Sequence, residues 1–466
     1  MTATHVPTVG ILPFYLKLYD DLLPECRAGF DGFVERIATA FEARGLTARI
    51  APVCRVAAEF KAAISQFEAD GVDCLVTLHL AYSPSLEAID AFCQTHLPII
   101  ILNATLDAEF GCGVSPKRIM YNHGVHGVMD FASMLRRRER SFEIVAGHGA
   151  DPQVLDRAAD HAQALIAATL RGSRVLRVGP TFAGMGDFSV DENVLAAKLG
   201  ILVTQIGLDT LDEAVRAVTD AAVTQEVADD HKRFACDLPE EALARSVRVG
   251  LGLRHILETG GYSGFSVNFQ AFNRGDRPAN TMPFLEISKA MGRRIGYAGE
   301  GDVLTAALVG ALARAFGAVT FTEIFCADWA GNTLFLSHMG EISPGVAGDV
   351  PRVIAKPFFG GGSLDPAVLT CAVRPGPAVF VNLTPGPKDT FSLIVAPVEV
   401  LAEDATLDPT MRDGVRAWMR PQGKVASFLE AYSRAGGTHH SALVIGDRAD
   451  AIAAFGRNCG LDIVRI

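Results

Sequence analysis

Thr8-Val-Gly-Ile-Leu-Pro-Phe14 is a run of mostly apolar residues near the start of the chain. Such a run is typical of a strand that is buried on both faces of a parallel sheet. A helical period follows from Gly29 to Arg44 and ends at Gly45, a residue suited to closing a helix. Strand-like and helix-like segments then alternate: Ala48–Val53 (strand), Ala57–Asp70 (helix), Cys74–Leu80 (strand), Pro84–His96 (helix, with proline near its first turn) and Pro98–Asn103 (strand).

This alternation predicts βαβ units, and therefore an open parallel sheet with helices on both faces. A second series of the same kind begins near Arg174, with a strand at Val175–Val178 and a glycine-rich turn at Gly179–Phe188. It continues through Ile201–Gly207, Leu211–Thr224, Glu240–Glu258 and Gly264–Phe269, with a helix at Thr305–Phe316. The chain is therefore predicted to be of the α/β class, with two doubly wound, flavodoxin-like domains.

The pattern changes after residue 316 to short β-rich segments separated by glycine and proline. Their spacing predicts a third domain, a β-sandwich or a small barrel. Terminal helices are expected at Met411–Arg420 and Val425–Ala435, and Gly360-Gly-Gly362 is expected to be a turn. The predicted strands are Val319–Phe325, Thr333–His338, Val353–Ala355, Ala367–Arg374, Ala378–Leu383 and Phe391–Glu399, and the predicted domains are 1–172, 173–315 and 316–466.

Composition narrows the possible partners. The chain has 466 residues, 49% hydrophobic and 20% charged, which is ordinary for a globular protein. Its net charge of -11 disfavours nucleic acid, because phosphate binding needs a basic face. Nine scattered cysteines fit reduced thiols, and the N-terminus has no secretory signal pattern. The longest apolar stretch, Ala306–Val319, is too short and interrupted to span a bilayer, so we expect a soluble, cytoplasmic protein.

Four short polar segments in the second half hold the candidate chemistry. They contain Glu300, Glu323, His338 and His440. Two carboxylates and two imidazoles form a ligand set suited to a divalent cation such as Mn²⁺, Co²⁺ or Mg²⁺. The absence of cysteine from the set argues against a structural zinc site. Because carboxylates on a metal can also move protons, we expect Glu300 and Glu323 to be catalytic.

Taken singly, these residues have simpler explanations. Glu300 could stabilise the start of a helix, although its flanking glycines favour a tightly approached site. His338 alternates with apolar neighbours, and a lone histidine on such a strand is more often a core residue. Glu323 lies in an apolar run, where an unpaired carboxylate is costly to bury, and this favours a ligand.

In their order and separation, these segments resemble the metal-ligand segments of the L-arabinose isomerase family, within the arabinose and fucose isomerase group. None is specific alone, but four in register over about 140 residues are hard to obtain by chance. The resemblance rests on Ala298-Gly-Glu-Gly-Asp302, Phe321-Thr-Glu323, Ser337-His-Met-Gly-Glu341 and Gly436-Gly-Thr-His-His440, with weaker similarity at Leu18-Tyr19, Leu78–Pro84, Asn122–Gly127 and Val145–His148.

The resemblance implies a Mn²⁺-like ion held by Glu300, Glu323, His338 and His440. It also implies a sugar pocket shared between subunits of a homotrimer or homohexamer, with His126 contributed by a neighbour's N-terminal domain. The implied substrate-binding residues are Leu18, Tyr19, His123, His126, Met185, Phe269, Phe321 and His439. Three positions depart from the family pattern: Leu16 and His123 replace glutamines and Val303 replaces a tryptophan, so the sugar stays open.

The implied activity is metal-dependent aldose–ketose isomerisation of a free pentose or hexose through a metal-stabilised enediol. One carboxylate would take the C2 proton and the other would pass a proton between oxygens, with a hydride shift as an alternative route. Two other functions stay open: an isomerase or epimerase of another polyol or deoxy sugar, and a non-catalytic sugar-binding protein. No nucleotide cofactor is expected, because Gly184-Met-Gly186 lacks the rest of a dinucleotide fingerprint.

Overall fold

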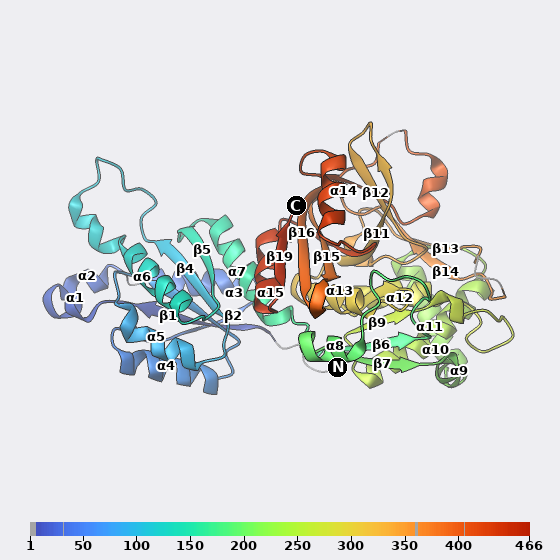
Figure 1. The fold of residues 1–466 in the computed structure, drawn as a ribbon, viewed down its shortest axis with the longest axis horizontal. Helices are drawn as coiled ribbons and strands as arrows, with labels where there is room; N and C mark the ends of the chain where they lie inside the picture. The colour runs from blue at the N-terminus through green and yellow to red at the C-terminus, as the bar shows by residue number, and fades with distance from the viewer. Residues whose placement is uncertain (1–5, 31, 359–361, 405) are drawn as a thin grey trace. The chain divides into compact units, whose positions relative to one another are not determined.

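A computed structural model describes residues 6–30, 32–358, 362–404 and 406–466 (Figure 1). By its internal contacts the chain forms two compact units, residues 1–167 and 168–466. The turn predicted at Gly360-Gly-Gly362 lies largely outside the described residues. Within the described ranges, no helix has the length and apolar character needed to cross a membrane.

The N-terminal unit is a doubly wound α/β sheet, as predicted. Its five strands pair in parallel in the order β2-β1-β3-β4-β5, which is the flavodoxin-like order. Adjacent residues of β1 face opposite cores: Ile11 packs with helices α3 and α7, whereas Leu12 packs with α4, α5 and α6. The elements are β1 (Thr8–Phe14), α1 (Lys17–Leu22), α2 (Pro24–Ala28), α3 (Phe33–Glu42), β2 (Thr47–Ile50), α4 (Ala57–Ala69), β3 (Cys74–His79), α5 (Ser85–Gln94), β4 (Ile99–Thr105), η1 (Pro116–Tyr121), α6 (Gly124–Arg137), β5 (Glu143–His148) and α7 (Pro152–Ala167).

A second parallel sheet opens the C-terminal unit, and it confirms the second predicted α/β series. Its parallel strands lie in the order β10-β9-β6-β7. The chain adds β7 on one side of β6 and then β9 and β10 on the other side, so the order of addition changes direction between β6 and β9. Sheets of this kind bind ligands beyond the carboxyl ends of the strands at that point. The elements are β6 (Arg174–Val178), α8 (Glu192–Val194), η2 (Leu195–Leu199), β7 (Leu202–Ile206), α9 (Leu208–Arg216), α10 (Asp220–Arg233), α11 (Glu240–Gly260), β9 (Gly264–Val267), η3 (Phe269–Ala271), α12 (Phe284–Gly292), β10 (Gly296–Gly299) and α13 (Val303–Phe316).

The β-rich C-terminal part is a closed barrel rather than a sandwich. Six antiparallel strands pair in the ring β15-β18-β11-β12-β17-β16, and β16 pairs back with β15 to close it. Strand β19 adds in parallel to β16, while β8, β13 and β14 form a separate small sheet. The elements are β8 (Ala235–Asp237), β11 (Val319–Asp328), β12 (Thr333–Ser337), η4 (Pro344–Val346), β13 (Arg352–Ala355), β14 (Ala367–Thr370), β15 (Gly376–Pro385), η5 (Pro387–Asp389), β16 (Phe391–Val400), η6 (Pro409–Asp413), β17 (Ala417–Pro421), α14 (Val425–Arg434), β18 (His440–Ile445), α15 (Ala449–Asn458) and β19 (Asp462–Arg465).

One predicted helix is wrong. The segment Met411–Arg420 is not helical, because a short 3-10 turn ends at extended Gly414 and strand β17 follows. Ala417 and Met419 are buried while Arg420 is exposed, which is the two-residue period of a strand. The edges of β12 and β16 bind this strand and complete the barrel. The helix predicted at Val425–Ala435 is present as α14.

Candidate metal centre

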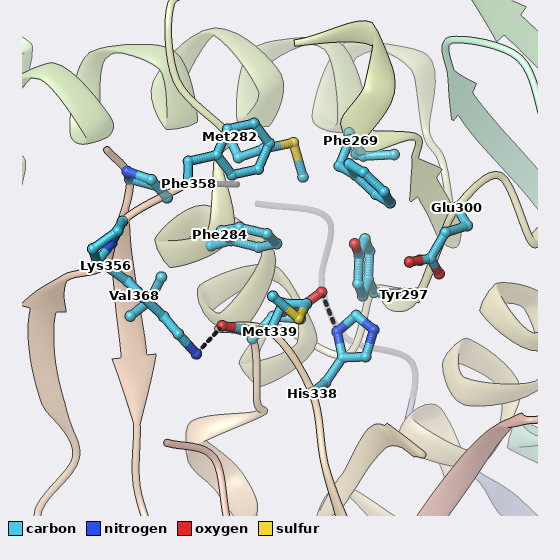
Figure 2. Close-up of a pocket in the computed structure, with 15 residues that line it drawn as sticks. Phe269, Met282, Phe284, Tyr297, Glu300, His338, Met339, Lys356, Phe358 and Val368 are labelled. Atoms are coloured by element: carbon cyan, nitrogen blue, oxygen red, sulfur yellow. Dashed lines mark hydrogen bonds and ion pairs between the residues drawn. The ribbon is translucent and has the colours of Figure 1, made fainter. Parts of the chain in front are cut away.

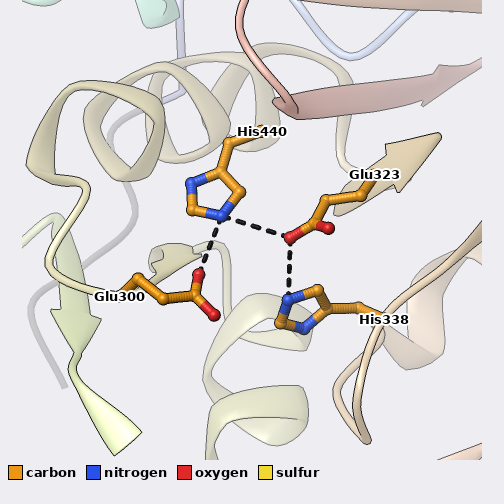
Figure 3. Close-up of side chains that lie close together, drawn as sticks. All are labelled: Glu300, Glu323, His338 and His440. Atoms are coloured by element: carbon orange, nitrogen blue, oxygen red, sulfur yellow. Dashed lines mark ion pairs between the residues drawn. The ribbon is translucent and has the colours of Figure 1, made fainter. Parts of the chain in front are cut away.

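Four side chains from separate elements converge in the C-terminal unit (Figure 3). Glu300 follows β10, Glu323 lies on β11, His338 follows β12 and His440 begins β18. One ligand atom from each lies within 4.8 Å of the others, and we call this set the ligand cluster. The side chains of the cluster are at most 14% exposed, and that of His440 is fully buried. The two carboxylates therefore face one another in a mostly dry site.

The barrel register brings three of the four ligands together. Strand β11 lies between β12 and β18, and Glu323 is directly opposite both Ser337 and His440. Residues directly opposite in an antiparallel pair point to the same face of the sheet, so Glu323 meets His440, while His338 comes one residue after Ser337. Phe321, two residues before Glu323, lies edge-on to both imidazoles, with ring centroids 4.8 and 5.0 Å away. The resemblance assigned Phe321 to the sugar pocket, and here it is buried against the ligands.

The fourth ligand depends on an unusual backbone. Glu300 has φ 55°, in the left-handed region that few non-glycine residues adopt. A Cβ at Gly299 would lie 3.5 Å from the His338 ring, and one at Gly301 (φ +91°) would lie 2.6 Å from the Cα of Thr181. Gly301 is therefore required for this close approach and for its positive φ, whereas a side chain at Gly299 would make only ordinary contacts.

Nitrogen and oxygen atoms are very close inside the cluster. Nε2 of His440 lies 2.8 Å from Oε2 of Glu300 and 3.2 Å from Oε1 of Glu323. Nε2 of His338 lies 2.9 Å from the same Glu323 oxygen. Oε2 of Glu300 and Nε2 of His440 are nevertheless buried atoms without an aligned hydrogen bond among the described residues. An ion between the four ligands would satisfy these atoms.

Each imidazole is held from behind by a buried carboxylate. Nδ1 of His440 hydrogen-bonds Oδ2 of Asp302 at 3.0 Å, and Nδ1 of His338 lies 2.7 Å from Oε1 of Glu341. Both carboxylates are fully buried. Metal-binding histidines usually carry such a carboxylate partner, which fixes the ring and the nitrogen that faces the ion.

The charges shift the pKa values of the ligands strongly. Burial opposes protonation of His338, but the nearby Glu341 and Glu323 carboxylates outweigh it and raise the pKa of His338 to about 10. The pKa of His440 is also raised, since the surrounding carboxylates of Asp302, Glu300 and Glu323 outweigh its burial. The pKa of Glu323 is lowered, because its two imidazole partners outweigh burial. The carboxylates therefore demand positive charge at the centre, either as imidazole protons or as a cation.

Two carboxylates and two imidazoles within this span fit a divalent cation. The separation of at most 4.8 Å matches ligands on opposite sides of an ion with metal–ligand distances of about 2.0–2.4 Å. Within the described part of the chain, neither Glu300 nor Glu323 pairs with a lysine or arginine. Among the described residues, no lysine or arginine therefore competes with an ion for the centre.

A buried polar network holds the His440 backbone. Nδ2 of Asn382 on β15 donates to the His440 carbonyl at 2.7 Å and to Oγ1 of Thr438 at 2.6 Å. The Tyr432 hydroxyl on α14 donates to the Thr438 carbonyl at 2.6 Å. The segment before β18 is thus fixed from inside the barrel.

A pocket with mostly apolar walls adjoins the cluster (Figure 2). Glu300 and His338 line one side in this view, and Lys356 lies on the other, where its Nζ donates to the Met339 carbonyl at 2.7 Å. Burial lowers the pKa of Lys356. Between these polar groups the wall is formed by Phe269, Met282, Phe284, Phe358 and Val368.

The other expected pocket residues divide between the two units. Phe269 lines the pocket, and Met185 lies in the loop after β6. The ring of His439 is 4.2 Å from that of His440. In the N-terminal unit, the Tyr19 hydroxyl lies 3.2 Å from Nε2 of His123, the His123 and His126 rings are 6.1 Å apart, and Leu18 is exposed.

Several residues that support the site are not singled out by the sequence pattern. Asp302 and Glu341 had a local signal, since each carboxylate follows a candidate ligand by two or three residues. Asp187, whose Oδ2 lies 2.6 Å from Nδ1 of His439, had none, because 252 residues separate the two. Only the folded structure brings Asp187 next to His439.

Comparison with known proteins gives one consistent family. The L-arabinose isomerase central domain matches residues 174–316, and the L-arabinose isomerase C-terminal domain matches residues 318–462. An L-arabinose isomerase of Acidothermus cellulolyticus is 27% identical over 463 residues, covering 93% of this chain and 88% of that protein. One from Herpetosiphon aurantiacus is 27% identical over 84% of this chain and 80% of its own, and one from Nocardioides is 29% identical over 74% and 70%.

Proposed function

This chain belongs to the L-arabinose isomerase family and is an aldose–ketose sugar isomerase, and from this premise we propose that the ligand cluster is its metal-dependent active site. The observation that carries the proposal is the convergence of Glu300, Glu323, His338 and His440 within 4.8 Å, with no lysine or arginine paired to the carboxylates among the described residues. We propose Mn²⁺ as the ion, with Co²⁺ or Mg²⁺ as possible replacements.

The four ligands would hold the cation, which would stabilise the negative charge that develops on the sugar oxygens. Glu300 and Glu323 divide the proton transfers: one carboxylate takes the proton from C2, and the other passes a proton between O1 and O2. Asp302 and Glu341 keep the imidazoles turned toward the centre. The aromatic wall beside the cluster excludes water, which strengthens these electrostatic interactions.

The substrate proposal is a free pentose or hexose. The relatives are named L-arabinose isomerases, which makes L-arabinose the first sugar to test. The apolar wall formed by Phe269, Phe284 and Phe358 offers few partners for hydroxyl groups, and this favours including deoxy sugars in the panel. We further propose that Met185, Phe269, Phe321 and His439 contact the substrate.

We propose that the working enzyme is a homotrimer or homohexamer whose sites include Leu18, Tyr19, His123 and His126 of a neighbouring subunit. Large apolar side chains on the surface of the N-terminal unit support an interface: Leu18, Leu22, Phe110, Ile119 and Met129 are 47–68% exposed. We also propose that 173–315 and 316–466 are separate domains, which the two family matches support.

The test is ketose formation from a panel of aldopentoses, aldohexoses and deoxy sugars. The protein is assayed after metal removal, after addition of Mn²⁺, and as the Glu323→Gln variant. We expect turnover of at least one sugar that requires the ion and is lost in Glu323→Gln. If the protein binds Mn²⁺ stoichiometrically but converts no sugar, the proposed reaction is wrong and a binding role takes its place.

A further inference from the structure

The pocket beside the ligand cluster contains a cation that the isomerisation step does not use. Lys356 lines this pocket together with Glu300 and His338, and it lies on the opposite side from them in Figure 2. It follows strand β13, and its backbone N–H donates to the Pro366 carbonyl at 3.1 Å. Its Nζ donates to the Met339 carbonyl at 2.7 Å. Both ends of this residue are therefore held at the wall of the pocket.

No carboxylate of the described residues forms an ion pair with Lys356, and the group that its Nζ contacts is a neutral carbonyl. Glu341 lines the same pocket, but its Oε1 lies 2.7 Å from Nδ1 of His338 and its Oε2 accepts from the Gly340 backbone N–H at 2.7 Å. An ammonium group has three donors, so two remain for a ligand. Because Lys356 is half-buried, water solvates its charge only in part, and an anionic group in the pocket would complete its contacts.

The wall between the ligand cluster and Lys356 offers few contacts to a polar ligand. Phe269, Met282, Phe284 and Val368 present only hydrocarbon and thioether groups to the pocket. The charged groups therefore lie on two sides, with Glu300 and His338 on one and the ammonium group on the other (Figure 2). A ligand that matches both sides carries the oxygens that bind a metal ion at one end and an anionic group at the other.

We propose that Lys356 determines specificity by binding a carboxylate at the end of the sugar remote from C1, so that the preferred substrate is an aldohexuronate. This inference rests on the proposed function, because C1 and C2 of the same molecule must lie at the ligand cluster. The C6 carboxylate takes no part in the bonds that change. It holds the sugar in the pocket while the other end is isomerised.

A single lysine beside apolar side chains suits a carboxylate better than a phosphate. A carboxylate carries one negative charge, and its two oxygens can accept from the two remaining donors of the ammonium group. A phosphate ester carries a charge of about −2 at neutral pH and is typically bound by arginines or by the N–H groups of a helix start. The described residues that line this pocket include no arginine and no second lysine.

The experiment measures ketose formation by the Mn²⁺-loaded protein from D-galacturonate and D-glucuronate, each beside its methyl ester, and from L-arabinose. D-Galacturonate has the configuration of L-arabinose at C2, C3 and C4, and the ester keeps the carbon skeleton but removes the charge. We expect the wild type to prefer at least one uronate to its ester. Lys356→Gln keeps a donor for the Met339 carbonyl but loses the charge, and it should lower the ratio of kcat/KM for uronate over ester about 10–100-fold.

Lys356→Arg, which keeps the charge, should retain part of this preference. Lys198→Gln, on the exposed surface of η2, is the matched control and should retain all of it. A purely structural role of Lys356 would lower kcat/KM for charged and neutral sugars alike. The ratio between uronate and ester would then stay the same in Lys356→Gln, and the proposed role would be wrong.

The remaining outcomes separate the two proposals. If the wild type forms ketose from L-arabinose but does not prefer either uronate to its ester, the carboxylate-binding role is wrong and the isomerase stands. A preference for D-ribose 5-phosphate over both uronates would likewise overturn the proposed substrate class. If no sugar, neutral or acidic, forms ketose, the proposed isomerisation fails instead.

Discussion

Two buried groups of charged side chains lie in the C-terminal unit, and they are neutralised in opposite ways. In the ligand cluster, carboxylates and imidazoles face one another without a lysine or arginine among the described residues. The second group, which we call the helix network, joins α10, α11 and α12. It consists of Glu226, Asp230, Arg254, Glu286 and Lys289.

Every carboxylate of the helix network has a cationic partner. Nζ of Lys289 lies 2.6 Å from Glu226 and 2.8 Å from Asp230, and Arg254 lies 2.6 Å from both Glu226 and Glu286. The charges of the helix network are therefore neutralised by its own lysine and arginine side chains, and no bound ion is needed there. The ligand cluster is similarly buried, but its described residues include no lysine or arginine, and its only counter-charges are imidazole protons that a metal ion can replace, so an ion fits there and not between the helices. Buried charge alone does not identify a functional site; here the distinguishing feature is that the carboxylates have no lysine or arginine partner among the described residues.

The largest expected effect is that of Glu300→Gln. Removing one carboxylate charge should lower metal-dependent ketose formation by about 10³-fold or more, because we propose that this carboxylate both holds the ion and moves protons. The matched control is Glu226→Gln, the same change in the helix network, which should retain catalysis. The measurement is the rate of ketose formation by both variants at saturating Mn²⁺. If Glu300→Gln were as active as Glu226→Gln, the proposed functional difference between the ligand cluster and the helix network would be wrong.

Lys289→Met tests the other side of the comparison. It leaves Asp230, which is fully buried, without its lysine, and should lower the free energy of unfolding by about 3–5 kcal/mol. Thermal and denaturant unfolding would measure this loss, with Lys198→Met on the exposed surface as the control. We expect the Mn²⁺ affinity of the folded variant to stay unchanged, and a large drop in affinity would show that the two groups are coupled.

Asp302→Asn should have an intermediate effect. Asp302 caps α13 through Oδ1, which accepts from the Thr305 backbone N–H at 2.9 Å, and orients His440 through Oδ2. Asparagine preserves the cap but not the negative charge behind the imidazole. Mn²⁺ affinity should fall about 10–100-fold in calorimetric titrations. Asp191→Asn, at the cap of α8, should leave the affinity unchanged, and the proposed role of Asp302 is wrong if the two variants behave alike.

The smallest expected effect is a dependence of ion binding on pH. The pKa of His338 is raised from 6.5 to about 10 in the ion-free protein, so this imidazole is protonated at neutral pH and must lose its proton to bind a cation. Affinity should therefore fall about tenfold for each pH unit below neutrality per proton released. Calorimetry in buffers of different ionisation enthalpy counts those protons, and a count of zero would contradict the shift.

The same shift stabilises the ion-free fold. Because the pKa of His338 is raised on folding, this contribution is fully present below about pH 6.5 and is lost as the pH rises toward about 10. Bound metal should reverse the trend, since it replaces the proton.

The sequence predicts most of the architecture because its signals are local. Each parallel strand, such as Thr8–Phe14, is a short apolar run followed by a helical period, and both α/β sheets follow from that pattern. The sequence left a sandwich and a small barrel open, because closure depends on β15 pairing with both β16 and β18, and β18 lies far along the chain. The strand within Met411–Arg420 has no clear local signal, because β17 is defined by its neighbours β12 and β16.

The residues of the candidate site also fall into those with a local sequence signal and those without one. Glu300, Glu323, His338 and His440 could be identified because each lies in a short recognisable segment, and Asp302 and Glu341 lie in two of those segments. Asp187 and Asn382 could not, because their roles exist only through contacts with residues 252 and 58 positions away.

The most direct test of this account is a crystal structure of the protein grown with Mn²⁺, with diffraction data collected at the manganese absorption edge. We predict a single strong anomalous peak among Glu300, Glu323, His338 and His440, and none within the helix network. An empty ligand cluster at saturating Mn²⁺, or a peak between α10 and α12 instead, would contradict the claim that uncompensated buried charge marks the active site.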